Sequence, residues 1–536
     1  MRDKFPSPAL RVGVTGHRPP KLSTDEEPKL REAVRQVILF VQTTTHDLVK
    51  QIKHYDGEEP ILRIISPLAE GADRLVAEEG LTLGFKLHCP LPASREEYRH
   101  DFKTKESSDA FDQLLLRADA VFELDGQRAG EWLEPVAYES VGRMTLSHSD
   151  VLIAIWDGDQ GAQGGTGQTV REARQAGVCT IRIDLRNPLQ IECHLPWTET
   201  AADWQGELRK SIKGALLPPE SAVKRALDFL QEPFTGNESD PITKQRDQAD
   251  RIAGRYARRY RGAYKAIYAL ATLAVLFAVG GLWLLGNGSD VVPEWLLPFL
   301  ELLCIGAILS VILWGNHAHW HERWLDARML AEQFRTWAFL APIGQTPSTS
   351  RLPPYVSPEA ARLDWTGWYL RARVREQGLL SVKVTSGYLE KYRHLLLQAI
   401  EEQVRHHSGK GQGRKRTYER IEFAAVILFS FTALACVFHL KAKEIFWLTT
   451  LGAITAALPA LGAALEGASP RRVRRLAERA EGMQLELADI HKRLEMPETK
   501  SLTYIELAQI AHEASAVMLD ELSDWRNLVR VRTLHL

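Results

Sequence analysis

Apolar residues are grouped in two different ways along this chain. Within residues 1–200, short apolar runs alternate with amphipathic segments, which predicts strands alternating with helices. Such alternation is typical of a parallel, doubly wound sheet, so we expect a Rossmann-like α/β fold at the N-terminus. The strands are expected at residues 10–15, 60–66, 85–90, 120–124, 151–156 and, as the last, 178–184, and the helices at 29–53, 72–83 and 169–176.

Beyond residue 260 the pattern changes to long apolar stretches. Four of them are long enough to cross a bilayer as helices, and only Glu301 interrupts them with a charge. They occupy residues 266–285, 295–315, 423–440 and 445–465. We therefore expect the α/β domain to be followed by an all-α membrane region with two transmembrane hairpins.

Basic residues flank these stretches unevenly. Arg258, Arg259 and Lys265 come just before the first stretch, whereas residues 286–294, between the first two stretches, contain no Lys or Arg. Arg471 and Arg472 follow the fourth stretch. The positive-inside rule then predicts a multi-pass protein of the inner or plasma membrane, with both termini in the cytoplasm.

The two expected hairpins resemble copies of one unit. Residues 328–332 read R-M-L-A-E, and residues 474–478, which lie 146 positions later, read R-R-L-A-E. Each copy has a basic segment, two apolar stretches and a long amphipathic helix in the same order, which favours duplication. The expected domains are 1–200 (ligand-binding), 201–262 (linker and juxtamembrane helix), 263–345 (first two-span module), 346–413 (cytoplasmic helical insert) and 414–536 (second two-span module).

Small and polar residues follow three of the expected strands. The carboxyl ends of parallel strands meet at one edge of a sheet, where ligands bind. Glycines allow close backbone approach, and amides at a helix start favour an anion, so we predict a site for a phosphate-bearing ligand. The expected ligand-binding residues are Thr15, Gly16, His17, Arg18, Ser66, Glu70, Gly71, Asp73, Arg74, Asp157, Gly158, Gly164, Gly165 and Thr166.

The chemistry of this site stays open at the level of sequence. Arg18 is expected to bind an anion, while His17 either shuttles a proton or serves only in a turn. Asp73 and Asp157 are candidates for a carboxylate pair that binds ribose or acts in acid–base catalysis, although Asp73 also suits the first turn of a helix. No metal site is expected, because His317, His319 and His321 do not share one helix face. No resident cofactor is expected either.

Charge and cysteine content narrow the possible partners. The chain has 5 cysteines, far apart and with no C-x-x-C pair, which favours a reducing compartment without disulfides. Its net charge is −1, and residues 1–200 hold 24 Lys and Arg against 32 Asp and Glu. An acidic domain lacks the electrostatic footprint of a nucleic-acid binder, so nucleic acid is not an expected partner.

Three motifs identify a resemblance. They are G-V-T-G-H-R at residues 13–18, L-A-E-G-A-D-R at 68–74, and D-V-L-I-A-I-W-D-G at 150–158 followed by G-G-T at 164–166. Together they resemble the SLOG superfamily of Rossmann-like nucleotide-binding domains, which includes Smf/DprA, the LOG enzymes and the YpsA-like proteins, the last being the most similar. The apolar hairpins with long helices resemble the SLATT domain, a two-span module of predicted bacterial conflict systems.

The resemblance implies a function. In such fusions a nucleotide-derived ligand is sensed in the cytoplasm and a membrane effector responds, with pore formation in a defence system as one form of response; a pore implies a homo-oligomer. LOG enzymes carry P-G-G-x-G-T-x-x-E, but Gln163, Gln168 and Arg171 stand here in place of the proline, threonine and glutamate, so LOG-type hydrolysis does not follow. The alternatives are a membrane-tethered nucleotide hydrolase or N-glycosidase, and a structural membrane protein with a vestigial pocket.

Overall fold

The structure is a computed structural model, and the chain forms two compact units. The sheet unit comprises Met1–Lys244, Glu332–Leu397 and Met496–Ala516, and the helical unit comprises Gln245–Ala331, Gln398–Glu495 and Val517–Leu536. The residues described are 5–19, 21–22, 27–52, 55, 57–130, 132–159, 164–194, 201, 203–217, 229, 240–286, 293, 295–347, 365–439, 445–467, 470–495 and 502–529.

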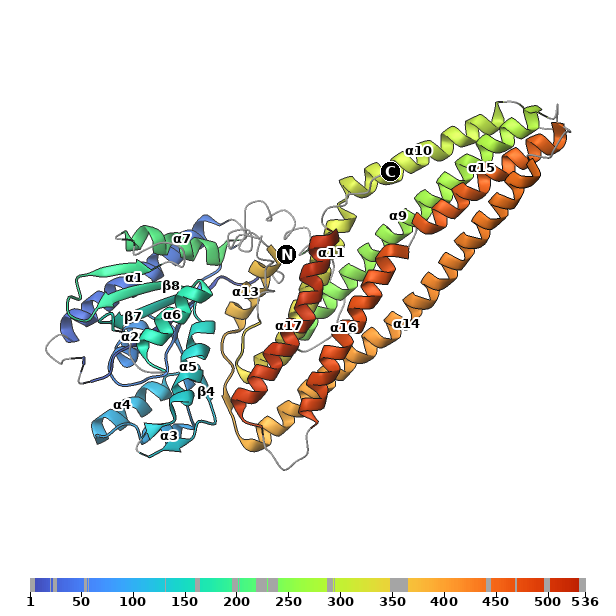
Figure 1. The fold of residues 1–536 in the computed structure, drawn as a ribbon. Helices are drawn as coiled ribbons and strands as arrows, with labels where there is room; N and C mark the ends of the chain where they lie inside the picture. Colours follow the sequence, from blue (N-terminus) through green and yellow to red (C-terminus); the bar gives the residue numbers. More distant parts are fainter. Residues whose placement is uncertain are drawn as a thin grey trace. The chain divides into compact units, whose positions relative to one another are not determined.

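The sheet unit is built on an eight-stranded, mostly parallel sheet (Figure 1). Its order is β10-β4-β3-β2-β1-β7-β8-β9, and only the β8–β9 pair is antiparallel. Six of the strands confirm the predicted ones: β1 (Ala9–Gly16), β2 (Ile61–Ile65), β3 (Lys86–Leu91), β4 (Ala120–Glu123), β7 (Val151–Trp156) and β8 (Cys179–Asp184). The coarse fold class, an α/β sheet followed by helices, is therefore confirmed.

Strand β1 is the point at which the direction of winding reverses. The chain proceeds from β1 through β2 and β3 to β4, and then returns to β7 on the other side of β1. Gly13 of β1 pairs with Ile65 on one side and with Leu152 on the other. A crevice opens beyond the carboxyl ends of the strands at such a switch point.

Two strands of the main sheet were missed by the sequence patterns, as was the small hairpin at residues 128–133. The prediction that 178–184 is the last strand is wrong, because β9 (Ile191–His194) and β10 (Val382–Lys383) extend the two edges of the sheet. Strand β9 reads I-E-C-H and β10 only V-K, so neither has the apolar run of a buried strand. Strand β10 also falls within the helical insert expected at residues 346–413, whose described part forms α13 (Trp365–Gln377) and the start of α14 (Ser386–His439).

Helices cover both faces of the sheet. On one face, α1 (Glu27–Gln51) packs against α2 (Ala72–Thr82) and α7 (Trp204–Leu216), and on the other α5 (Pro135–Ser147) packs against α6 (Thr166–Ala176). The side chains of β7 alternate accordingly, since Ile153 joins the core beneath α1 whereas Leu152 packs with residues of α5 and α6. Helices α3 (Arg95–Arg99) and α4 (Lys105–Leu116), and the small hairpin of β5 (Arg128–Ala129) and β6 (Trp132–Leu133), complete the N-terminal part.

Segments from much later in the chain complete the second face. The Gly344 carbonyl, after the short helix η4 (Ala341–Ile343), lies 3.0 Å from the His148 ring. Leu379 donates its N–H to the ring of His88 at 3.1 Å, and Arg375 of α13 pairs with Asp150 at 3.5 Å. The sheet unit therefore extends beyond the boundary expected at residue 200, because buried polar groups of its strands and their flanking loops are satisfied by residues after 340.

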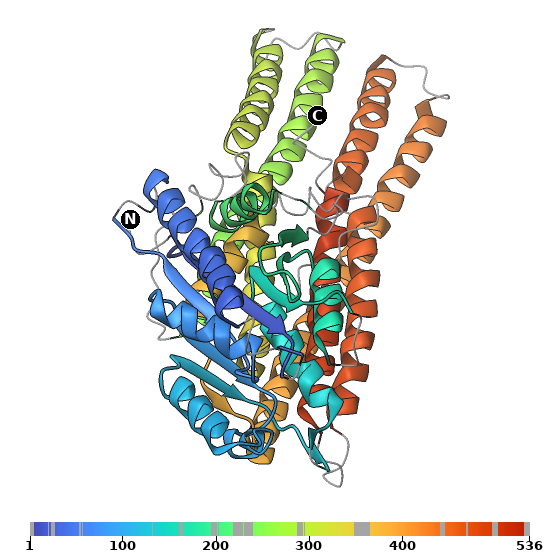
Figure 2. The same cartoon turned by 90° about the vertical axis from the view of Figure 1, so that its left-hand side faces the viewer.

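The helical unit consists of long helices, several of which also contribute residues to the sheet unit. Figure 2 shows two pairs, α9 (Pro241–Gly286) with α10 (Leu296–His317) and α14 with α15 (Ile445–Gly467). The Trp283 indole donates to the Thr450 hydroxyl at 3.0 Å, which joins α9 to α15. The remaining helices are α11 (Trp320–Leu340), α16 (Pro470–Leu494) and α17 (Tyr504–Val529).

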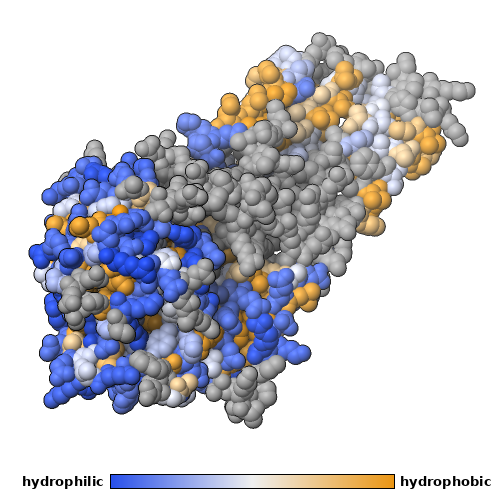
Figure 3. Space-filling view, turned by 60° about the vertical axis from the view of Figure 1, so that its left-hand side comes forward, coloured by the Kyte–Doolittle hydropathy of each residue, from blue (hydrophilic) through white to orange (hydrophobic). Residues whose placement is uncertain are grey.

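Two of these helices could cross a membrane by length and composition, namely Pro241–Leu284 and Leu296–His317. In the second pair, the apolar stretches of the described residues are shorter, at Val426–Phe438 and Thr449–Pro459. Over the described residues, the structure thus offers two candidate spans where four were expected. Apolar side chains lie exposed over this unit (Figure 3), among them Leu302 at 66% and Leu313 at 69%.

Candidate functional site

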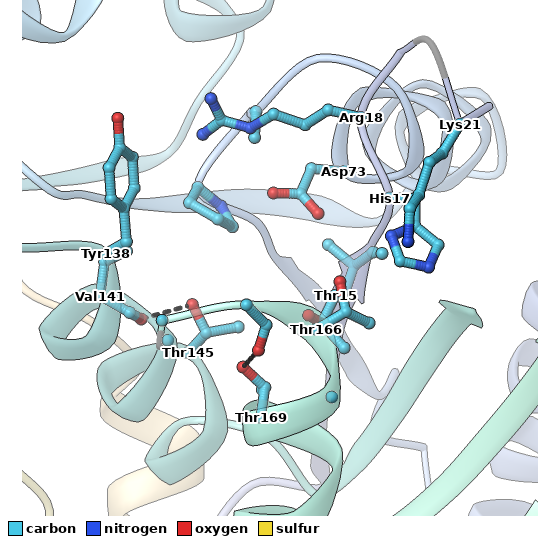
Figure 4. Close-up of a pocket in the computed structure, with 18 of the residues that line it drawn as sticks. Thr15, His17, Arg18, Lys21, Asp73, Tyr138, Val141, Thr145, Thr166 and Thr169 are labelled. Carbon is cyan, nitrogen blue, oxygen red and sulfur yellow. Dashed lines mark hydrogen bonds between the residues drawn. The ribbon is translucent and has the colours of Figure 1, made fainter. Parts of the chain in front are cut away.

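A cavity of about 330 Å³ lies at the carboxyl ends of the central strands (Figure 4). Its walls come from β1 and the loop after it, from the loop that precedes α2, and from α5 and α6. The lining residues are Val14, Thr15, Gly16, His17, Arg18, Lys21, Pro67, Ala69, Asp73, Tyr98, Tyr138, Val141, Gly142, Thr145, Asp159, Gly164, Gly165, Thr166, Gly167 and Thr169. This is where the switch point predicts a ligand site, and the volume is within the range of small-molecule pockets.

The segment that follows β1 is held against the start of α2. The Ala72 N–H donates to the His17 carbonyl at 3.3 Å, and a Cβ on Gly71 would lie 2.8 Å from that same oxygen. Gly71 also has a φ of +88°, which a residue with a side chain rarely adopts. Gly71 therefore sets the path of the segment that carries His17 and Arg18, although it does not itself line the cavity.

Arg18 is fixed at the rim by groups from three other elements. Its guanidinium donates to the Tyr98 hydroxyl at 3.4 Å, lies 3.9 Å from the Asp101 carboxylate, and stands 5.3 Å from the centre of the Tyr138 ring. Burial disfavours the charged form of Arg18, but electrostatic interactions with Tyr98, Tyr138 and Asp73 outweigh this effect, so the pKa of Arg18 is raised. A permanently charged group, oriented before any ligand arrives, suits the binding of a phosphate or carboxylate.

Asp73, in the first turn of α2, lies beneath Arg18 in Figure 4. Its side chain is removed from water, and this burial raises its pKa to about 7, even though Arg18 and an Ala69 backbone hydrogen bond oppose the shift. A carboxyl with such a pKa exchanges its proton near neutral pH. Asp73 can therefore donate a hydrogen bond to a ligand, or act as an acid or a base.

His17 is paired with Asp157, which follows β7. The His17 Nε2 atom lies 2.8 Å from Asp157 Oδ1, and the Lys21 ammonium lies 3.5 Å from Oδ2. Burial opposes ionisation of Asp157, but the hydrogen bonds from His17 and the Asp159 amide prevail and hold its pKa well below the usual range. Asp157 is thus an ionised partner that orients His17, whereas Asp73 is the carboxyl whose pKa is raised.

The start of α6 forms the opposite wall. Gly165 is the N-cap residue, and no side chain of the described residues caps the helix there. Gly164 has a φ of +74°, and a Cβ on it would lie 3.0 Å from the Pro135 carbonyl, so only glycine lets this loop approach α5. The first amides of α6 are consequently available at the cavity, where a helix N-terminus favours an anion.

The structure brings eight of the expected ligand-binding residues to the cavity wall, from three separate strand ends. These are Thr15, Gly16, His17, Arg18, Asp73, Gly164, Gly165 and Thr166. Asp157 contacts the His17 ring and does not itself line the cavity, and neither Gly71 nor Gly158 is among the lining residues. The prediction that distant strand ends converge on one site agrees with this geometry.

Three further expected residues make internal contacts instead. The Ser66 hydroxyl donates to the Asp73 carbonyl at 3.0 Å and accepts from the Leu68 amide. Arg74 donates to the Leu68 carbonyl at 3.0 Å and to the Ser107 carbonyl at 2.9 Å, while Glu70 accepts from the Ser107 hydroxyl. These residues shape the loop before α2 and join it to α4, and none of them lines the cavity.

Helix α5 contributes a wall that the sequence analysis missed. Tyr138, Val141, Gly142 and Thr145 line the cavity from this helix, and Thr169 of α6 lies nearby. The spacing of three, four and seven residues places them on one helix face, which is the signal that could have found them. Lys21 and Tyr98, from loop and helix positions without a motif, gave no comparable signal.

The site combines groups suited to bind an anion with a carboxyl group whose pKa lies near neutral pH. Among the residues that the structure describes, no cluster of three His, Cys, Asp or Glu side chains could hold a metal ion. Comparisons with protein-family models, with curated proteins and with solved structures found no match.

Proposed function

We propose that this protein is a membrane-embedded sensor of a nucleotide-derived ligand. The sheet unit binds the ligand in the cavity at the β1 switch point, and the long helices convey the response to the membrane. The single observation that carries the proposal is the convergence of Arg18, Asp73 and the uncapped start of α6 on one 330 Å³ cavity. Arg18 and the α6 amides suit a phosphate, and Asp73 suits a polar group of a sugar or base.

The resemblance to SLOG domains supports this choice of ligand class. The motifs of that superfamily fall on the elements that form the cavity, namely residues 13–18 on β1 and its loop, 68–74 at the start of α2, and 164–166 at the start of α6. Residues of these three segments line one cavity. YpsA-like nucleotide sensing is therefore the function that we assign to the sheet unit.

For the helical unit we propose two transmembrane hairpins of the SLATT kind, formed by α9 with α10 and α14 with α15. The apolar side chains exposed on α10 support the first hairpin, and those exposed on α14, such as Phe431 at 58%, support the second. The cytoplasmic side is then the one that carries the basic residues before the apolar part of α9 and after α15, with both termini.

Linkage between ligand and membrane would follow from the continuity of the helices. Helix α14 begins within the sheet unit, just after β10, and belongs to the helical unit from Gln398 onward. A ligand that binds one arrangement of the sheet unit more tightly shifts the population of that arrangement and of the helices attached to it. Assembly of several copies would be required for a pore, and defence by membrane permeabilisation is the role that this mechanism serves.

The binding step is tested with the full chain in mild detergent. Nucleoside mono- and diphosphates, dinucleotides and cyclic nucleotides are screened by thermal shift, and hits are measured by titration calorimetry. Arg18→Ala should weaken binding by about 100-fold, as expected for loss of a charge-assisted pair. Arg117→Ala, an exposed arginine elsewhere in the sheet unit, is the matched control. If no nucleotide shifts the melting temperature, or if both variants behave alike, the proposal fails.

A second candidate function is hydrolysis of the bound ligand, and the pairing of His17 with Asp157 favours it. A histidine oriented by a carboxylate can accept a proton from water, and Asp73, which is protonated below about pH 7, can donate one to a leaving group. Chromatography of the ligand after incubation separates the two functions. Turnover that Asp73→Asn abolishes without loss of binding would assign an enzyme, and an unchanged ligand would assign a sensor.

A further inference from the structure

The helical unit carries a dense group of cations at the point where α9 becomes apolar. Residues 251–265 contain five arginines, one lysine and no carboxylate, and the uncharged apolar run begins at residue 266. Four of these residues, Arg258, Arg259, Arg261 and Lys265, are exposed, and we call them the basic cluster. They fall within about two turns of one helix, so their charges act on the same small region of surface.

Nearby carboxylates are engaged elsewhere. Asp250 pairs with Arg328 of α11 at 3.3 Å, and Asp247 pairs with Arg246 at 2.9 Å. Among the described residues, no carboxylate forms an ion pair with any member of the basic cluster, and Arg261 donates only to the Ala257 carbonyl at 3.1 Å. Within the described ranges, the positive charge of the cluster is therefore not neutralised by a carboxylate.

Aromatic rings lie at the same end of the α9–α10 pair. The Tyr260 and Tyr264 rings are 5.0 Å apart, and Tyr264 is followed by a stacked Tyr268 at 6.3 Å. At the end of α10, Trp314 contacts Trp320 at 5.4 Å. Tyrosine and tryptophan prefer the boundary between hydrocarbon and water, because one part of each ring is apolar and the other forms hydrogen bonds.

The two helices are held side by side at this level. Tyr260 and Ile267 of α9 form one buried cluster with Ile308 and Ile312 of α10, and Trp324 of α11 packs against it. The end of α10 thus lies beside the start of the apolar part of α9. Cations and tyrosines thus alternate over residues 258–268, and exposed apolar side chains follow on α9, at Leu273, Leu276 and Leu282, as expected for a helix that passes from the phosphate level into hydrocarbon.

We infer that the basic cluster binds the phosphate groups of anionic phospholipids in the cytoplasmic leaflet. Charge complementarity identifies the occupant, because an exposed group of four cations adjoining an apolar helix matches a surface of lipid phosphates. Each Lys or Arg near an anionic surface strengthens binding roughly fivefold, so the cluster selects anionic over zwitterionic lipid. The inference rests on the proposed placement of α9 and α10 in a bilayer, and it adds a lipid class to that proposal.

The test is lipid competition with the full chain reconstituted into vesicles. Tryptophan fluorescence is quenched with brominated phosphatidylglycerol or with brominated phosphatidylcholine, and the ratio of the two association constants is determined. The wild-type chain should favour phosphatidylglycerol at least about fivefold, and 0.5 M salt should reduce the ratio. In the variant R258Q/R259Q/R261Q/K265Q the ratio should fall to about one, while quenching by either lipid persists.

The matched control removes the same number and kind of charges from exposed positions of the sheet unit, as K50Q/R117Q/R186Q/R209Q. It should keep the wild-type ratio, and loss of preference in this control would overturn the inference in favour of net charge alone. Equal quenching by both lipids in the wild type would also overturn it, yet would leave the membrane proposal intact. Absence of quenching by either lipid would refute the membrane placement itself. Glycerol phosphate at millimolar concentration should not change the ratio; if it does, the cluster binds free phosphate.

Discussion

Strand β7 and helix α10 are both apolar, but their side chains differ in exposure to solvent. Leu152 and Ile153 of β7 are fully buried between two layers of helices, whereas Leu302 and Leu313 of α10 are two-thirds exposed. Burial therefore follows from the neighbours that an element has, and not from its own hydropathy alone. In the sheet unit the apolar side chains are removed from water by protein, and in the helical unit we propose that lipid has this role.

The largest expected effect separates these two environments. Leu152→Ala should cost about 4 kcal/mol of stability, because it leaves a cavity in a closed core. In detergent, Leu313→Ala should change stability by less than about 0.5 kcal/mol, since its side chain touches little protein. Thermal unfolding of each purified variant measures the two changes in stability. Equal losses would mean that α10 packs in a protein core.

A charge inside the sheet unit provides the next comparison. The pKa of Asp73 is raised to about 7, so the folded state holds a proton that the unfolded chain releases near pH 4. Stability should therefore fall as the pH rises from about 4 to about 7, and remain low above that range. Asp73→Asn should raise stability by about 4 kcal/mol at pH 8 and by little at pH 4. A melting temperature whose pH dependence is unaltered in the variant would contradict the assignment.

A charge in α10 tests the proposed lipid environment directly. Leu309→Arg, near the middle of the apolar stretch, should disfavour insertion by about 2.5 kcal/mol, because an arginine at the centre of a span is costly. Sucrose flotation of membranes after cell expression measures the loss of membrane-bound protein. Leu116→Arg, at an exposed leucine of the sheet unit, should leave flotation unchanged. If the two variants float alike, α10 does not enter the bilayer.

The smallest effect concerns the loop before α6. Gly164→Ala should cost about 2 kcal/mol and weaken ligand binding, since both the positive φ and the Pro135 carbonyl oppose a Cβ there. Gly130→Ala is a matched control, because Gly130 has nearly the same φ, +75°, and nothing within 4 Å of the added Cβ. The difference in melting temperature and in ligand affinity between the two variants isolates the contact with α5.

The strands of the sheet and the convergence of three of their ends could be predicted from sequence, because both depend on local patterns. Strand β7 reads V-L-I-A-I-W, and glycines and polar residues follow it directly. The roles of Ser66 and Arg74 could not be predicted, because the side chain at a motif position can face a cavity or form hydrogen bonds within the protein. Here the Ser66 side chain contacts Leu68 and the Arg74 side chain contacts Ser107. Only the folded loop decides between these directions.

Features that depend on distant segments were beyond the sequence patterns. Strand β10 consists of Val382 and Lys383 and is a strand only because β4 lies beside it. The wall from α5 depends on Tyr138 and Thr145 facing a cavity that other elements close. The raised pKa of Asp73 likewise arises from burial, which depends on the folded structure and not on a local pattern.

The interleaved sheet unit has a consequence for synthesis on the ribosome. Arg11 and Arg63 of β1 and β2 are buried, and the groups beside them include Arg375 and Glu376, which are translated after α9 and α10. The N-terminal strands therefore leave the ribosome before these polar partners exist, and they acquire them only after α9 and α10 have been made. The sheet unit is thus completed only after the synthesis of α9 and α10, although every residue that lines the cavity, from Val14 to Thr169, has been made by then.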